Sequence, residues 1–240
     1  MEIWITILLV VCLASVVQGV AGFGFGIVTI SMIPLVLGFR DSISLMTLLM
    51  VAVSIMMFFR TRREFNWKDC KNIIPGLVLG VPIGVYIVVV VDEALILKIF
   101  GVINIIIGLH YLLYNRRKGK AIPEVFAFPV GLSGGLLAGA FNMGGPPLIA
   151  YLYSRPWDLD RIKSVMSTAF LATTFLRLPF VGLTAERVDL VLLLFLAALV
   201  PIWIFMNFGF SLARKFTAQG LRNAVYTYLT LIGCYYLFIH

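Results

Sequence analysis

Long apolar runs follow one another along almost the whole chain and strongly restrict the possible fold. Most runs have about the length an α-helix needs to cross the hydrocarbon core of a bilayer, roughly 18 to 22 residues, and only short polar segments separate the runs. Charged residues make up 12% of the 240 residues, about half the share of an ordinary soluble domain. We therefore predict an all-α polytopic membrane protein. The apolar runs lie at about 2–18, 20–38, 42–59, 72–91, 95–114, 125–141, 145–153, 162–182, 187–209 and 219–239.

The net charge of +8 is concentrated in short segments beside the apolar runs. Two basic loops, 60–71 and 115–120, are separated by two runs and by the acidic turn Asp92-Glu93. Lys and Arg favour the cytoplasmic side of a membrane protein, so both loops are predicted to be cytoplasmic. Because a membrane topology accounts for the basic residues, we expect the lipid bilayer and no nucleic acid as a partner.

Residues 1–118 and 121–240 show weak internal similarity in a shared order. A glycine-rich segment opens each half, and short motifs recur further along. The matching pairs are 81–83 with 200–202 (both VPI), Met46 with Met166, and Asp69 with Asp189. The sequence therefore predicts two repeats that form a single integrated transmembrane domain.

Loops that are basic in the second half correspond to loops that are not basic in the first half, and the reverse also holds. This alternation predicts inverted-topology repeats. Inversion requires each glycine-rich unit, 2–38 and 125–153, to enter and leave the membrane on one side. Each repeat is then a Gly/Pro-broken helical hairpin plus three full transmembrane helices. Pairs of complete but short helices remain an alternative for the hairpins.

The hairpin tips, near 22–26 and 142–147, are the predicted substrate site. Broken helices expose backbone N–H groups that bind anions, and inverted-repeat transporters hold substrate at such breaks near the midplane. The alternative is that the glycines only allow close helix packing, which we prefer for Gly76, Gly80 and Gly84. The candidate substrate-binding residues at the tips are Gln18, Gly22, Gly24, Gly26, Asn142, Gly144, Gly145, Pro146 and Pro147.

Arg177 is the only basic residue clearly inside an apolar run. A guanidinium suits an oxyanion, so Arg177 joins the candidate site. The alternative is that its side chain extends to the membrane interface. None of the eleven carboxylates lies in the middle of a run, which argues against a carboxylate proton relay.

Enzymatic chemistry and cofactors are not expected. Gly131-Leu-Ser-Gly resembles the motif of intramembrane serine proteases, but neither His110 nor His240 has a convincing spacing to Ser133. The cysteines form no metal-binding spacing, and the chain has no phosphate-binding GxxxxGK[ST] loop for ATP. A secondary carrier is therefore favoured, with a non-transporting membrane scaffold or accessory subunit as the alternative. Glycine-rich faces also leave a homo-oligomer possible.

Three motifs together resemble the TauE/SafE family, the sulfite exporter-like membrane permeases. They are Gly22-Phe-Gly-Phe-Gly followed by Pro34-Leu35, LGVPIG at 79–84, and Asn142-Met-Gly-Gly-Pro-Pro-Leu148. The resemblance covers nearly the whole chain. It implies a bacterial-type inner-membrane permease that moves small sulfur-containing anions, such as sulfite, sulfoacetate or related organosulfonates, or other organic anions.

Overall fold

The computed structural model describes residues 2–114, 121–181, 185–213 and 218–238. Every element in these ranges is an α-helix or a short 3₁₀ turn, which confirms the predicted all-α class. The basic loop 115–120 and His240 lie outside the described residues.

The helices follow the apolar runs, with small differences at their ends. The first half contains α1 (Glu2–Ala21), α2 (Phe25–Met32), α3 (Pro34–Leu37), α4 (Phe39–Thr61), η1 (Arg62–Glu64), α5 (Trp67–Cys70), α6 (Ile74–Val90) and α7 (Glu93–Tyr114). The second half contains η2 (Glu124–Phe126), α8 (Ala127–Phe141), α9 (Gly145–Leu152), α10 (Leu159–Arg177), η3 (Leu178–Phe180), α12 (Val188–Leu212) and α13 (Ala218–Phe238). The largest departure is at 20–38, where α1 continues to Ala21 and the return helix begins only at Phe25.

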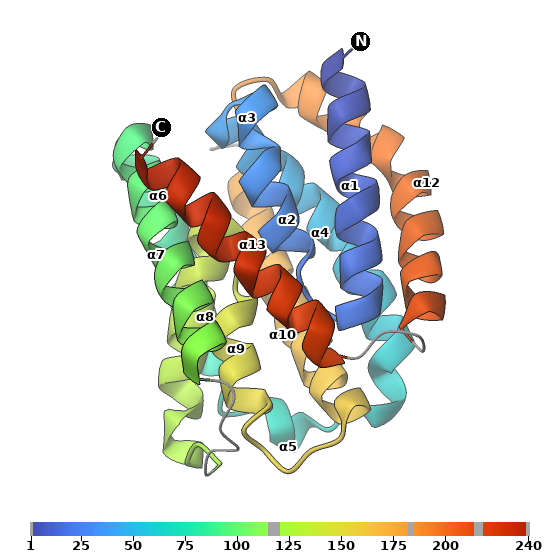
Figure 1. The fold of residues 1–240 in the computed structure, drawn as a ribbon, viewed down its shortest axis with the longest axis vertical. Helices are drawn as coiled ribbons and strands as arrows, with labels where there is room; N and C mark the ends of the chain where they lie inside the picture. The colour runs from blue at the N-terminus through green and yellow to red at the C-terminus, as the bar shows by residue number, and fades with distance from the viewer. Residues whose placement is uncertain (1, 115–120, 182–184, 214–217, 239–240) are drawn as a thin grey trace.

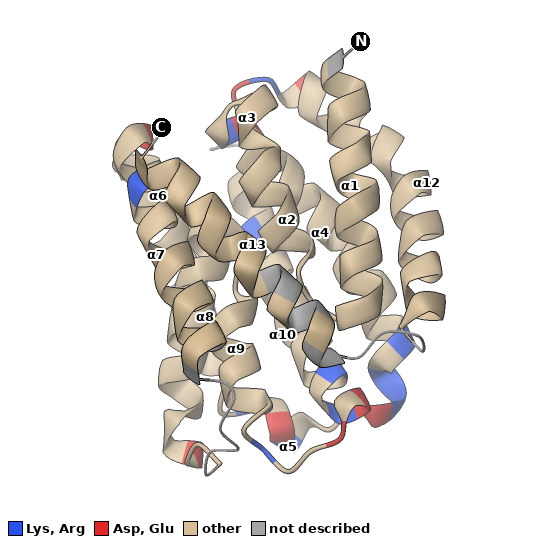
Figure 2. Ribbon diagram, in the orientation of Figure 1, with Lys and Arg blue, Asp and Glu red and all other residues tan. Residues whose placement is uncertain are grey.

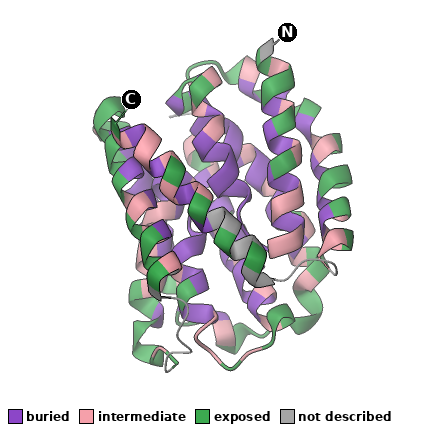
Figure 3. Cartoon of the chain, viewed as in Figure 1, coloured by how far each residue is buried: buried purple, intermediate pink, exposed green. Residues whose placement is uncertain are grey.

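Five helical segments of the described chain are long and apolar enough to cross a membrane: those in α1, α4, α7, η2–α8 and α12. Many large apolar residues are exposed, and Figure 3 shows exposed residues along the outer helices of the bundle. Lipid replaces water around such a surface in a membrane. Charged residues gather mainly at the two ends of the bundle (Figure 2). The chain is therefore an integral membrane protein.

Two helical hairpins enter the bundle from opposite ends (Figure 1). The chain descends through α1, breaks, and returns through α2 to α3 at the end where it began; α8 and α9 form a corresponding hairpin whose base lies near α5. The two halves interlock, because α1 packs on α12, α6 on α8, α4 on α10 and α7 on α13. If each helix is replaced by its counterpart in the other half (α1 by α8, α4 by α10, α6 by α12, α7 by α13, and the reverse), the same four pairs result. The pairing is what inverted repeats would produce, and the duplication itself stays a prediction.

Glycines line the seam between α6 and α8. A Cβ atom on Gly76, Gly80 or Gly84 would lie closer to the α8 backbone than real Cβ atoms come. The facing glycines of α8 are equally restricted; a Cβ on Gly135 would lie 2.8 Å from the Leu77 carbonyl oxygen. The packing interpretation of the α6 glycines is confirmed.

An ion pair holds loops together at each end of the bundle. At the α3 end, the nearly buried Asp41 carboxylate at the start of α4 bonds Arg187 Nε at 2.7 Å, just before α12. At the α5 end, Asp69 accepts two 2.7 Å hydrogen bonds from Arg161 at the start of α10. The basic segment 60–71 therefore lies at the same end as the start of α10, as the inverted arrangement requires. Its cytoplasmic placement stays a prediction.

We expect Asp41→Asn to lower the free energy of unfolding by about 1–3 kcal/mol, because hydrogen bonds to a buried charged group are lost. Besides Arg187 Nε, the carboxylate accepts the backbone N–H groups of Glu186 and Arg187 at 2.8 and 3.0 Å. Thermal unfolding of the purified protein in detergent measures the change. The matched control is Glu186→Gln, which removes the exposed 4.0 Å pair with Arg40 from the same two segments and should change stability far less. Equal effects of the two variants would contradict this assignment.

Candidate functional site

The first break separates α1 from α2 at residues 22–24. Gly22 has a φ of +81° and its N–H donates to the Gln18 carbonyl at 2.7 Å, which ends α1 in a left-handed turn. Gly24 has a φ of +109°, a conformation that other residues adopt only with strain. The chain thereby reverses within three residues and starts α2 at Phe25.

The second break, at residues 142–144, is built in the same way. Asn142 is the only described non-glycine residue with a positive φ, +53°, and its N–H donates to the Ala138 carbonyl at 2.9 Å. Asn tolerates this left-handed conformation better than most residues. The helix α9 then begins at Gly145, three residues on, as α2 does after Gly22.

The two breaks meet inside the bundle. A Cβ on Gly26, in the first turn of α2, would collide with the Asn142 carbonyl oxygen. Only a glycine therefore lets the first turn of α2 lie against the second break. The two predicted hairpin tips therefore lie against each other in the described structure.

Gln18 links the two sides of the first break. Its Oε1 accepts the Phe25 N–H at 3.0 Å, and its Nε2 donates to the Gly22 carbonyl at 3.3 Å. Gln18 is 1% exposed, so these bonds satisfy backbone groups that no water reaches. The amide therefore stabilises the break in this conformation.

The Asn142 side chain fixes the second break to α4. Its Nδ2 donates to the Ile43 carbonyl and to Thr47 Oγ1, both at 3.2 Å. Thr47 was not among the residues predicted from the sequence. Thr47 lies on the buried face of α4, four residues after Ile43. This position indicates a contact with the second break only when the packing of α4 is known.

The first turn of α9 offers few backbone donors. Pro146 and Pro147 have no N–H, so the N–H groups of Gly144 and Gly145 are the donors available there. A Cβ on Gly144 would lie 2.7 Å from the Gly134 carbonyl oxygen, whereas one on Gly145 would have its nearest neighbour at 3.6 Å. Gly144 is thus required by packing and Gly145 is not.

Arg177 ends α10 beside the second break. The side chain is 3% exposed and does not extend to the membrane interface. Its Nη1 donates to the Ala138 carbonyl at 2.7 Å and to the Gly139 carbonyl, in the last turn of α8. Its Nη2 is buried and has no hydrogen-bond partner among the described residues. One guanidinium nitrogen is therefore left without a hydrogen bond inside the bundle.

A second cation, missed by the sequence analysis, lies beside the first break. The aliphatic part of Lys163, on α10, covers Gly22, with Cγ 3.0 Å from where a glycine Cβ would stand. The sequence places Lys163 in a basic stretch, where it looks like a topology signal. Its contact with Gly22 depends on the packing of α10.

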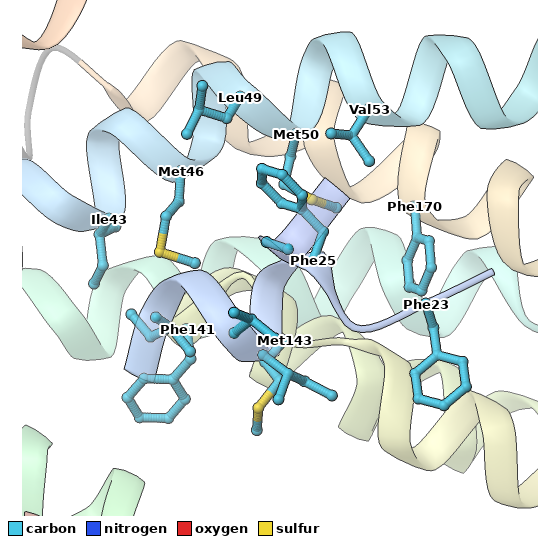
Figure 4. Close-up of a cluster of buried hydrophobic side chains, with 14 of the residues drawn as sticks. Phe23, Phe25, Ile43, Met46, Leu49, Met50, Val53, Phe141, Met143 and Phe170 are labelled. Atoms are coloured by element: carbon cyan, nitrogen blue, oxygen red, sulfur yellow. The ribbon is translucent and has the colours of Figure 1, made fainter. Parts of the chain in front are cut away.

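Apolar side chains enclose both breaks (Figure 4). Phe23 and Phe25 come from the first break, and Phe141 and Met143 from the second, and each is at most 4% exposed. Side chains of α4 and α10, Met46 and Phe170 among them, close the cluster. In the described conformation most residues of the two breaks are therefore buried, and Asn142 is partly exposed.

The other chemical candidates do not gather at the breaks. Ser133 Oγ donates to the Val130 carbonyl of its own helix at 3.0 Å. Within the described ranges there is no group of three His, Cys, Asp or Glu residues that could hold a metal ion.

We expect Gly26→Ala to lower the free energy of unfolding by about 1–3 kcal/mol, because the added methyl group overlaps the backbone of the second break. Gly145→Ala, which has room for the same methyl group, is the matched control and should stay within about 0.5 kcal/mol of the wild type. Thermal unfolding in detergent measures both. Equal loss of stability would show that the breaks are not in contact.

The comparisons with known proteins agree with the family resemblance seen in the sequence. The family described as "Sulfite exporter TauE/SafE" matches residues 7–236. The chain is 25% identical over 175 residues to the "Probable sulfite/organosulfonate exporter TauE" of Cupriavidus necator. That alignment covers 68% of this chain and 66% of the relative, just under two thirds of the relative's length. No solved structure matches the chain.

Proposed function

Because the chain belongs to the sulfite exporter TauE/SafE family, we propose that it is a secondary transporter that carries small sulfur-containing anions. Sulfite, sulfoacetate and related organosulfonates are the proposed substrates, and a bacterial-type inner membrane is the proposed location. The relative's name supports the substrate class. The observation that carries the proposal is the buried, partly unpaired Arg177 bonded to the end of α8, beside the second break.

The second break supplies the binding groups in this proposal. Arg177 Nη2 donates to one oxygen of the anion, and the N–H groups of Gly144 and Gly145 donate to others. A guanidinium and a helix N-terminus both favour a tetrahedral or pyramidal oxyanion. Asn142 orients the break through α4, and Pro146 and Pro147 keep it open by stopping α8 from continuing into α9.

The first break has a different role in the proposal. Gly22, Gly24 and Gln18 shape the turn, and Gly26 lets α2 approach the second break. Substrate reaches the breaks when the hairpins move relative to α4 and α10, since apolar side chains enclose them in the described conformation. In the inverted-repeat arrangement, with 60–71 and 115–120 cytoplasmic, the two hairpins open toward opposite sides of the membrane.

We expect Arg177→Gln to lower kcat/KM for sulfite about 10- to 100-fold, because a hydrogen bond from a charged group to the anion is lost. The measurement is counterflow of labelled sulfite into proteoliposomes containing the purified protein, with sulfonates and carboxylates run in parallel. Asn207→Ala is the control: Asn207 is a polar residue of α12 that donates to Trp203 of its own helix, so flux should be unchanged.

Two outcomes would contradict the proposal in different ways. Absence of counterflow for every anion with folded wild-type protein would favour a membrane scaffold or accessory subunit. Normal sulfite flux in a folded Arg177→Gln variant would leave a transporter but remove Arg177 from the substrate site.

Gly145→Ala tests the backbone donors separately. We expect its KM for sulfite to rise roughly tenfold, because a methyl group beside the N–H keeps the anion away while the fold tolerates it. Concentration-dependent counterflow gives KM and kcat, and an unchanged KM would exclude the start of α9 from the site.

A further inference from the structure

A groove at the α5 end of the bundle has a basic end and an apolar end. Two adjoining depressions of about 260 and 350 Å³ share Lys71, Asn72 and Glu124 as lining residues. The smaller one, the basic end, lies between α5 and the base of the α8–α9 hairpin. The larger one, the apolar end, lies between the start of α6 and the η2 turn.

Three cations line the basic end: Lys68, Lys71 and Arg155. The two carboxylates in its lining already have partners. Asp69 is bonded twice to Arg161, and Glu124 accepts the Asn72 side-chain amide at 2.7 Å. The basic end therefore keeps an excess of positive charge.

Arg155 is held in place at the basic end. Its guanidinium stacks 4.7 Å from the ring centroid of Tyr151 and 6.0 Å from that of Trp157, and it donates to the Tyr151 hydroxyl. Its Nε is buried and has no hydrogen-bond partner among the described residues. A fixed guanidinium with a free donor favours an oxyanion such as a phosphate.

The apolar end faces the surface that lipid covers. Pro75 and Phe128 line it together with Val125, which is 77% exposed. Exposed apolar side chains of α6, Val78 and Leu79, continue the surface beyond it. A small free anion would use only the basic end, whereas a phospholipid has both a phosphate and apolar chains.

We propose that this groove binds an anionic phospholipid. The phosphate lies against Lys68, Lys71 and Arg155, and an acyl chain follows Pro75, Val125 and Phe128. Basic pockets between membrane helices are known to favour such headgroups. Because Ala127 of α8 and Tyr151 of α9 also line the basic end, the lipid connects the base of the second hairpin to the start of α6.

Native mass spectrometry of the full-length protein from nanodiscs with equal phosphatidylglycerol and phosphatidylcholine tests the proposal. The wild type should retain phosphatidylglycerol preferentially. Lys71→Gln and Arg155→Gln should each reduce its retention about fivefold, the effect of one cation near a charged lipid. The control Arg63→Gln removes the same charge from an exposed position at the same end, outside the groove, and should retain the lipid. Lys71 lies on the surface, so its variant remains informative if Arg155→Gln does not fold.

The source of the phosphate is tested by a second arm. Val125→Asn, a change at an exposed position, should reduce lipid retention, and millimolar inorganic phosphate should not displace the lipid. Displacement by phosphate without an effect of Val125→Asn would assign the groove to a free oxyanion and overturn the proposal. Equal retention by the wild type, the groove variants and Arg63→Gln would overturn it as well.

Discussion

The contact between the two helix breaks is the constraint on which the rest of the structure depends. A chain that interrupts a helix inside a bilayer must give each freed backbone group a partner from the protein itself. Gln18 provides partners at the first break, Arg177 bonds carbonyl groups at the second, and Asn142 attaches the second break to α4. Gly26 then allows the two interruptions to share one apolar enclosure.

The enclosure also explains why the two halves interlock. Each hairpin packs against a helix of the other half, α1 against α12 and α8 against α6, along glycine contacts in which backbones nearly touch. The ion pairs at the two ends have reversed polarity: Asp41 of α4 meets Arg187 before α12, whereas Arg161 of α10 meets Asp69 before α6. The start of α4 carries a carboxylate where the start of α10 carries a guanidinium. This difference is consistent with a duplication after which the sequences of the two halves diverged.

The helices could be predicted from the sequence because a bilayer requires long apolar runs, and glycine and proline marked where the runs break. The roles of individual residues could not. Gly144 and Gly145 are neighbours in one motif, yet a Cβ would collide with α8 at Gly144 and would have room at Gly145. Gln18 was predicted to bind substrate, yet its side chain bonds backbone groups of the first break. Lys163 and Thr47 were missed because their contacts with the breaks depend on how α10 and α4 pack. The spacing of residues along the sequence does not indicate that packing.

The position of Arg177 links stability to the proposed function. Burying a guanidinium is costly, and the carbonyl groups at the C-terminal end of α8 offset part of that cost because the helix dipole is negative there. They engage Nη1 but leave Nη2 unpaired, so the offset is incomplete. An anion bound between Nη2 and the start of α9 would complete it, with the positive end of the α9 dipole on its other side. Arg177, which bonds the last carbonyl groups of α8, is therefore the residue that an anionic substrate would stabilise most.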